Sequence, residues 1–170
     1  MSLVIQLLVN GLLLGSVLAL AALGLSLIFG VMDVVNFAHG TFVMLAMYAG
    51  YVLWTVAGIV PFLSILIVAP VFFVFGVVTE RLVIAPIIDR PMFAQVFSTL
   101  GLLWILQYFA QFVFGPETRS FNAGYGGLAF AGIRIEEVRL YGFIITIVVT
   151  GLLYLFLQRT KTGLGIRATA

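Results

Sequence analysis

Four long stretches of this chain contain no charged side chain, and this feature decides what the chain can fold into. Asp, Glu, Lys and Arg are absent from the ranges 2–32, 34–79, 91–116 and 140–158. A helix needs about 20 apolar residues to cross roughly 30 Å of hydrocarbon. Only 8% of the residues are charged and 64% are hydrophobic, whereas a soluble domain carries about 25% charged residues. The sequence therefore predicts an all-α integral membrane protein.

The lengths of these stretches predict about five transmembrane helices in a single domain. The range 34–79 is too long for one crossing, and Gly58 and Pro61 form the strongest helix-stopping signal inside it. Gly30 is expected to stop the first helix. A β-barrel would show repeated segments of alternating polarity, whereas these apolar runs are continuous. The expected spans within residues 1–170 are 3–29, 40–57, 62–79, 92–114 and 140–157, with an outer loop at 115–139 and a tail at 158–170.

The basic residues predict how the chain is oriented. Lys and Arg concentrate in cytoplasmic loops. With the C-terminus inside, five basic residues lie on the cytoplasmic side and three on the outer side. We therefore expect the N-terminus outside and the C-terminus in the cytoplasm. In the outer loop, the alternation over residues 133–136 is compatible with a short strand, and residues 117–122 and 124–127 are expected to be irregular. This loop is either an ordinary solvated connection or a cap over an external entrance.

Several kinds of chemistry are absent from the sequence. The chain has no cysteine and a single histidine, His39, which excludes thiolate metal sites and argues against a zinc site. No basic cluster suggests a nucleic-acid partner. No GxxxxGK[ST] motif is present to bind nucleotide phosphates, so any ATP hydrolysis is expected on a separate subunit. His39 is the one intramembrane general base, and no acid lies at helical spacing from it, so we expect no catalytic residues. We also expect neither a bound metal nor a cofactor.

Small residues predict how the helices pack. In a bilayer, close approach of helix backbones depends on small side chains, because lipid supplies no hydrophobic drive between helices. Gly11, Gly15 and Ala19 follow one another every four residues in the first span, and Ala46 and Gly50 repeat the spacing in the second. Both faces are interpreted as helix-packing surfaces.

Polar residues inside the spans provide the candidate functional site. Each costs free energy unless it is paired or faces a wet cavity. Asn36, His39 and Gly40 lie between the first two spans, where Asn36 is a suitable N-cap. A helix N-terminus presents N–H groups suited to a carboxylate. This segment is either a capped turn at the membrane edge or the polar part of a substrate path, and Asn10 in the first span is a further path candidate.

Specific runs of sequence resemble a known family. The segment 22–40, which contains Asn36-Phe37-Ala38-His39-Gly40, closely resembles the permeases of branched-chain amino-acid ABC transporters, and in particular their first permease subunit. The resemblance continues at 44–45 and Tyr48, at 80–81, Pro86 and 90–91, and at 98–101, 114–117 and 160–170. It implies a bacterial inner-membrane importer subunit for hydrophobic amino acids. It also implies three kinds of partner: a second permease subunit, two ATP-binding subunits and an extracytoplasmic substrate-binding protein.

The end of the chain resembles the start of the family's coupling helix, which docks on the ATPase. The resemblance makes Gly163 and Arg167 candidates for that coupling, and it implies that the chain corresponds to the N-terminal portion of a permease. Thr41 and Ala46 depart from the common family pattern and leave the substrate open. Permeases for urea or short-chain amides resemble the same pattern, and a passive channel or an oligomeric membrane assembly protein is a further alternative.

Overall fold

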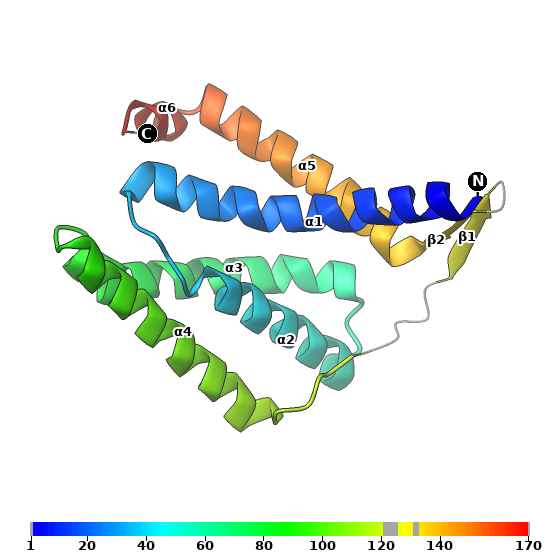
Figure 1. The fold of residues 1–170 in the computed structure, drawn as a ribbon, viewed down its shortest axis with the longest axis horizontal. Coiled ribbons are helices and arrows are strands. Elements are labelled where there is room, and N and C mark those ends of the chain that lie inside the picture. The colour runs from blue at the N-terminus through cyan, green and yellow to red at the C-terminus, as the bar shows by residue number, and fades with distance from the viewer. Residues whose placement is uncertain (1, 121–125, 131–132, 170) are drawn as a thin grey trace. The chain divides into compact units, whose positions relative to one another are not determined.

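The computed structural model of the protein describes residues 2–120, 126–130 and 133–169. Within these residues, five helices are long and apolar enough to cross a membrane, which confirms the predicted all-α membrane fold (Figure 1). The chain divides into two compact units, Met32–Ala123 on the one hand and Met1–Val31 with Gly124–Ala170 on the other. Of the residues expected to form irregular chain, 121, 122, 124 and 125 lie outside the described ranges.

A helical hairpin forms the first part of the unit Met32–Ala123. Its helices are α2, His39–Ala57, and α3, Pro61–Thr79. Gly58 ends α2 in the left-handed conformation at φ +64°, which glycine adopts without steric cost. Pro61 occupies the first turn of α3, where its fixed φ suits a helix start. The hairpin turn therefore falls at the Gly58–Pro61 signal seen in the sequence.

The two helices of the hairpin approach closely at small side chains. A Cβ on Gly50 would lie 3.6 Å from the hydroxyl of Ser64. Ser64 is buried, and its hydroxyl donates to the carbonyl of Pro61 at 2.6 Å. Farther along the pair, the rings of Phe42 and Phe75 lie 5.1 Å apart. The small-residue face predicted on α2 therefore contacts α3 at Gly50, as the physics of helix packing in lipid requires.

The helical path of α3 extends beyond the expected end of its span. A π-helical turn, Glu80–Ile84, and a 3-10 turn, Ala85–Ile87, continue it without a break. The chain then turns into α4, Met92–Phe114. The side-chain amide of Gln95 closes this turn by donating to the carbonyls of Ile88 and Arg90 at 3.0 and 3.1 Å.

The second unit is built on α1, Ser2–Met32, and α5, Glu137–Arg159. The two helices approach each other closely at Gly142, where an added Cβ would lie 3.3 Å from the side chain of Val17. The 31 residues of α1 make a helix about 46 Å long, which exceeds the hydrocarbon thickness and requires tilt or a protruding end. Before α5, an antiparallel hairpin pairs β1, Gly127–Phe130, with β2, Ile133–Glu136. The possible strand at 133–136 is thus present as β2.

The expectation that Gly30 stops the first helix is wrong. The helix continues through Gly30 to Met32, and the chain leaves it at Asp33, which has a left-handed φ of +52°. A glycine inside a helix costs only about 1 kcal/mol relative to alanine, and the surrounding apolar run overrides it. Aspartate tolerates the left-handed conformation better than most residues.

A sharp corner joins α5 to the short helix α6, Lys161–Thr169. The hydroxyl of Thr160 donates to the carbonyl of Phe156 at 2.7 Å and accepts the N–H of Gly163 at 2.9 Å. Gly163 is buried, and a Cβ there would lie 2.5 Å from the Leu157 Cα. Since real Cβ atoms do not approach a backbone so closely, the corner requires glycine at this position.

Candidate functional site

The segment before α2 is shaped by the side chain of Asn36. Its Oδ1 accepts the N–H of Ala38 at 3.0 Å, and its carbonyl accepts the N–H of His39 at 3.2 Å. The N-cap of α2 is Ala38, which has no side-chain cap. The prediction that Asn36 is the N-cap is therefore wrong by two residues. Asparagine readily bonds the N–H two positions ahead, so it fixes a turn that leads into the helix.

Thr99 ties this segment to α4. Its side chain is completely buried, and its hydroxyl lies 3.2 Å from the carbonyl of Val35. The same hydroxyl lies 3.0 and 3.1 Å from two carbonyls of its own helix, so it shares one proton among three acceptors. Val34 and Ala38 are also fully buried. The turn that carries Asn36 and His39 is thus packed firmly against α4.

A groove of about 410 Å³ runs along one face of α2. Six residues of α2 line it at the i, i+3, i+4 spacing of a single helix face: Gly40, Val43, Met44, Met47, Tyr48 and Tyr51. Residues 116–119, which follow α4, complete the lining. From Gly40 to Tyr51 the helix rises about 16 Å, which is roughly half the hydrocarbon thickness of a bilayer.

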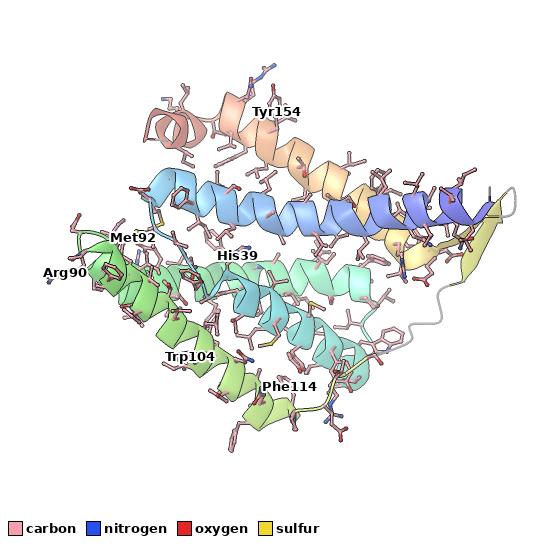
Figure 2. All side chains as sticks on the ribbon, in the orientation of Figure 1. His39, Arg90, Met92, Trp104, Phe114 and Tyr154 are labelled. Atoms are coloured by element: carbon pink, nitrogen blue, oxygen red, sulfur yellow. The ribbon has the colours of Figure 1, made fainter. Side chains whose placement is uncertain are left out.

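One contact with α2 and two local features position the segment after α4. The rings of Tyr48 and Phe114 stack with their centroids 4.3 Å apart and their planes 12° from parallel. Gly115 has a φ of +82°, which a residue with a Cβ rarely adopts and which redirects the chain after the helix. Arg119 donates from Nη2 and Nε to the carbonyl of Phe114 at 2.8 and 3.3 Å. Figure 2 labels His39 at the start of α2 and Phe114 at the end of α4.

The two ends of the groove differ in chemistry. From Val43 to Met47 the wall is made by valine and methionine, and the methionine thioether adapts to different apolar shapes. The other end carries the charged side chains of Glu117 and Arg119. The volume suits a small molecule, and the arrangement suits one with an apolar part and opposite charges. In the described part of the chain, no group of three or more His, Cys, Asp or Glu side chains is placed to hold a metal.

The structure separates the four predicted path residues. Gly40 lines the groove, while Asn36 and His39 are half-buried in the turn next to that end. Asn10 is half-buried on α1, in the other compact unit, and is not part of the groove lining.

Sequence reasoning missed the charged end of the groove. The sequence does contain a signal for this charged end, because Glu117 and Arg119 are the first charged residues after a long apolar helix. The methionine and tyrosine positions on α2 repeat at helical spacing, but an apolar packing face has the same pattern. What the sequence does not reveal is that residues 116–119 fold back onto that face.

The other residues predicted from the sequence lie in the unit that contains α1, α5 and α6. Gly163 is buried in the α5–α6 corner, and Arg167 lies on α6 with its side chain outside the described part. Gly11, Gly15 and Ala19 are exposed on α1, and no described atom lies within 4 Å of a Cβ built on either glycine. Their role as a packing surface stays a prediction.

Five apolar helices, one of which carries a groove, define a multi-pass membrane protein. A family model described as "Branched-chain amino acid transport system / permease component" matches residues 7–170. The chain belongs to this family, which confirms the resemblance seen in the sequence.

Curated relatives agree with this assignment. The chain is 27% identical over 180 residues to the "High-affinity branched-chain amino acid transport system permease protein BraD" of Pseudomonas aeruginosa, covering 98% of this chain and 59% of that protein. It is 30% identical over 169 residues to the "Probable branched-chain amino acid transport permease protein LivH" of Methanocaldococcus jannaschii, covering 91% and 51%. The chain therefore spans between half and three-fifths of the length of these relatives. No solved structure matches it.

Proposed function

We propose that this chain is part of the membrane-spanning permease subunit of an ATP-driven importer for branched-chain and other hydrophobic amino acids. The observation that carries the proposal is the groove along α2, which ends beside the Asn36–Gly40 segment in a chain that belongs to a permease family. The groove is part of the substrate path. The permease itself performs no chemistry on the solute.

The lining of the groove favours hydrophobic amino acids over urea or short-chain amides. Val43, Met44 and Met47 present apolar surface to its interior, which stabilises an aliphatic side chain by the hydrophobic effect. Urea has no such group and gains nothing from these contacts. The path therefore selects a solute with a branched or unbranched hydrocarbon chain.

The proposal includes partners and an orientation. The permease works with a second permease subunit, two ATP-binding subunits and an extracytoplasmic binding protein, in a bacterial inner membrane. The N-terminus lies outside and the C-terminus in the cytoplasm, where α6 begins the surface that docks on the ATPase. The rigid Gly163 corner supports this role, because it fixes the direction of α6 relative to α5, and Arg167 is the proposed docking residue.

Uptake by the complete transporter tests the function. Proteoliposomes that contain the full-length permease and its partner subunits should accumulate L-leucine only when ATP and the binding protein are supplied, and urea should not compete. ATP-independent flux of L-leucine down its gradient would identify a channel instead. Competition by urea at equal concentration would favour the amide-permease alternative.

A further inference from the structure

The charged end of the α2 groove has the features of a small-molecule binding site. Glu117 and Arg119 line the same cavity as Met44 and Met47. Arg119 uses two of its N–H groups on the carbonyl of Phe114. A guanidinium has five N–H donors, and the other three have no partner among the described residues. Glu117 likewise has no ion pair or hydrogen bond within the described part of the chain. One cation and one anion are thus available at one end of an apolar groove.

The contact with Phe114 makes Arg119 a fixed donor. Holding Nη2 and Nε at 2.8 and 3.3 Å from one carbonyl restricts the plane of the guanidinium. A restricted guanidinium loses less conformational entropy when it binds a ligand. Its free edge can engage a carboxylate with two parallel hydrogen bonds, which is the strongest geometry for this pair.

The same carbonyl and the nearby carboxylate provide the opposite polarity. The C-terminal end of α4 carries partial negative charge from its last carbonyls, and Glu117 adds a full negative charge two residues after Gly115. The negative charge of Glu117 and of the helix end stabilises an ammonium group, just as the positive charge of Arg119 stabilises a carboxylate. The ligand class that satisfies both groups and the methionine wall is a zwitterion with an aliphatic side chain.

We propose that this end of the groove is an amino-acid binding site, in which Arg119 binds the α-carboxylate, Glu117 binds the α-ammonium, and the side chain lies against Met44 and Met47. The proposal rests on the function proposed above and assigns the substrate's charged groups to particular residues. It also gives the segment after α4 a role as the mouth of the path rather than as a plain connection.

Ligand analogues test each charge separately. The full-length permease in its complete transporter, purified in nanodiscs, is titrated with L-leucine, with L-leucinamide, which lacks the carboxylate, and with 4-methylpentanoate, which lacks the ammonium. Arg119→Gln should weaken L-leucine binding by about ten- to a hundredfold, the effect of a charge-assisted hydrogen bond, and should leave leucinamide unchanged. Glu117→Gln should weaken L-leucine to a similar extent and leave 4-methylpentanoate unchanged. Arg90→Gln is the control, because Arg90 is exposed and lies outside the groove.

The outcomes separate this proposal from the proposed function. If wild-type transporter takes up L-leucine but both variants bind all three ligands as tightly as Arg90→Gln does, the binding site is wrong and the importer stands. An equal loss for L-leucine and for both analogues would also overturn it, because it would report altered folding of the segment rather than recognition of one charge. If the wild-type transporter neither binds nor imports L-leucine, the proposed function itself fails.

Discussion

The side chain of Asn36 determines the local conformation at the start of α2. It makes one hydrogen bond with the N–H of Ala38 and thereby fixes the turn that presents His39 and Gly40. Because the carbonyl of Val35 next to it accepts from Thr99, the turn is held from within and from α4. The first effect of this polar side chain is therefore on the geometry of the turn.

Asn36→Ala should lower L-leucine uptake in the complete transporter while the protein still reaches the membrane. Loss of a capping hydrogen bond costs about 1 kcal/mol and loosens the turn beside the groove. Asn36→Asp retains an oxygen acceptor for the Ala38 N–H, so it should keep most of the uptake. Equal uptake by wild type and Asn36→Ala, at equal membrane expression, would remove this turn from the path.

Thr99→Val should lower the apparent melting temperature of the detergent-purified protein. The substitution keeps the shape of a fully buried side chain but deprives the Val35 carbonyl of its donor, a loss of about 1 kcal/mol or more.

Thr55→Val is the matched control for this change. The hydroxyl of Thr55 is exposed and bonds only carbonyls of its own helix. If both valine variants melt at the same temperature, the bond between Thr99 and Val35 does not hold the turn in place.

At the scale of single elements, the boundaries show what the sequence could predict. The break between α2 and α3 was predictable, because Gly58 and Pro61 act through local backbone conformation. The end of α1 was not, because Gly30 has a weak local preference that a long apolar run overrides. The continuation of α3 through a π-helical turn at Glu80 was also missed, since a charged residue suggested the end of the span.

The α5–α6 corner gives the sharpest prediction for an element. Gly163→Ala should displace α6 and abolish coupling of ATP hydrolysis to uptake, because its Cβ would overlap the backbone of Leu157 and Phe156. The ATPase rate with and without L-leucine and binding protein is the measurement.

Gly165→Ala is the control within the same helix. A Cβ on Gly165 meets no described atom within 4 Å, and alanine favours helix more than glycine does. Stimulated ATPase activity should therefore persist in Gly165→Ala. Normal coupling in Gly163→Ala would contradict the role of this corner.

At the scale of the whole molecule, composition alone predicted the membrane fold, because long charge-free runs have few other stable states. The groove required the structure. Its α2 face is a helical stripe that sequence reasoning cannot distinguish from packing surface, and residues 116–119 reach it only through the Gly115 turn and the stack of Tyr48 on Phe114. A function that depends on two segments more than 60 residues apart in the chain leaves no local pattern.

The central claim is that the α2 groove is a water-accessible path for solute, and single-cysteine labelling tests it most directly. The chain has no cysteine of its own, so each introduced thiol reports one position. Met47 and Leu66 are 70% and 72% exposed, but only Met47 lines the groove. In the complete transporter, a charged methanethiosulfonate reagent should modify Met47→Cys, L-leucine should slow that reaction, and Leu66→Cys should stay unmodified in lipid. If Met47→Cys is as inert as Leu66→Cys throughout the ATP cycle, the groove faces lipid and is not the path.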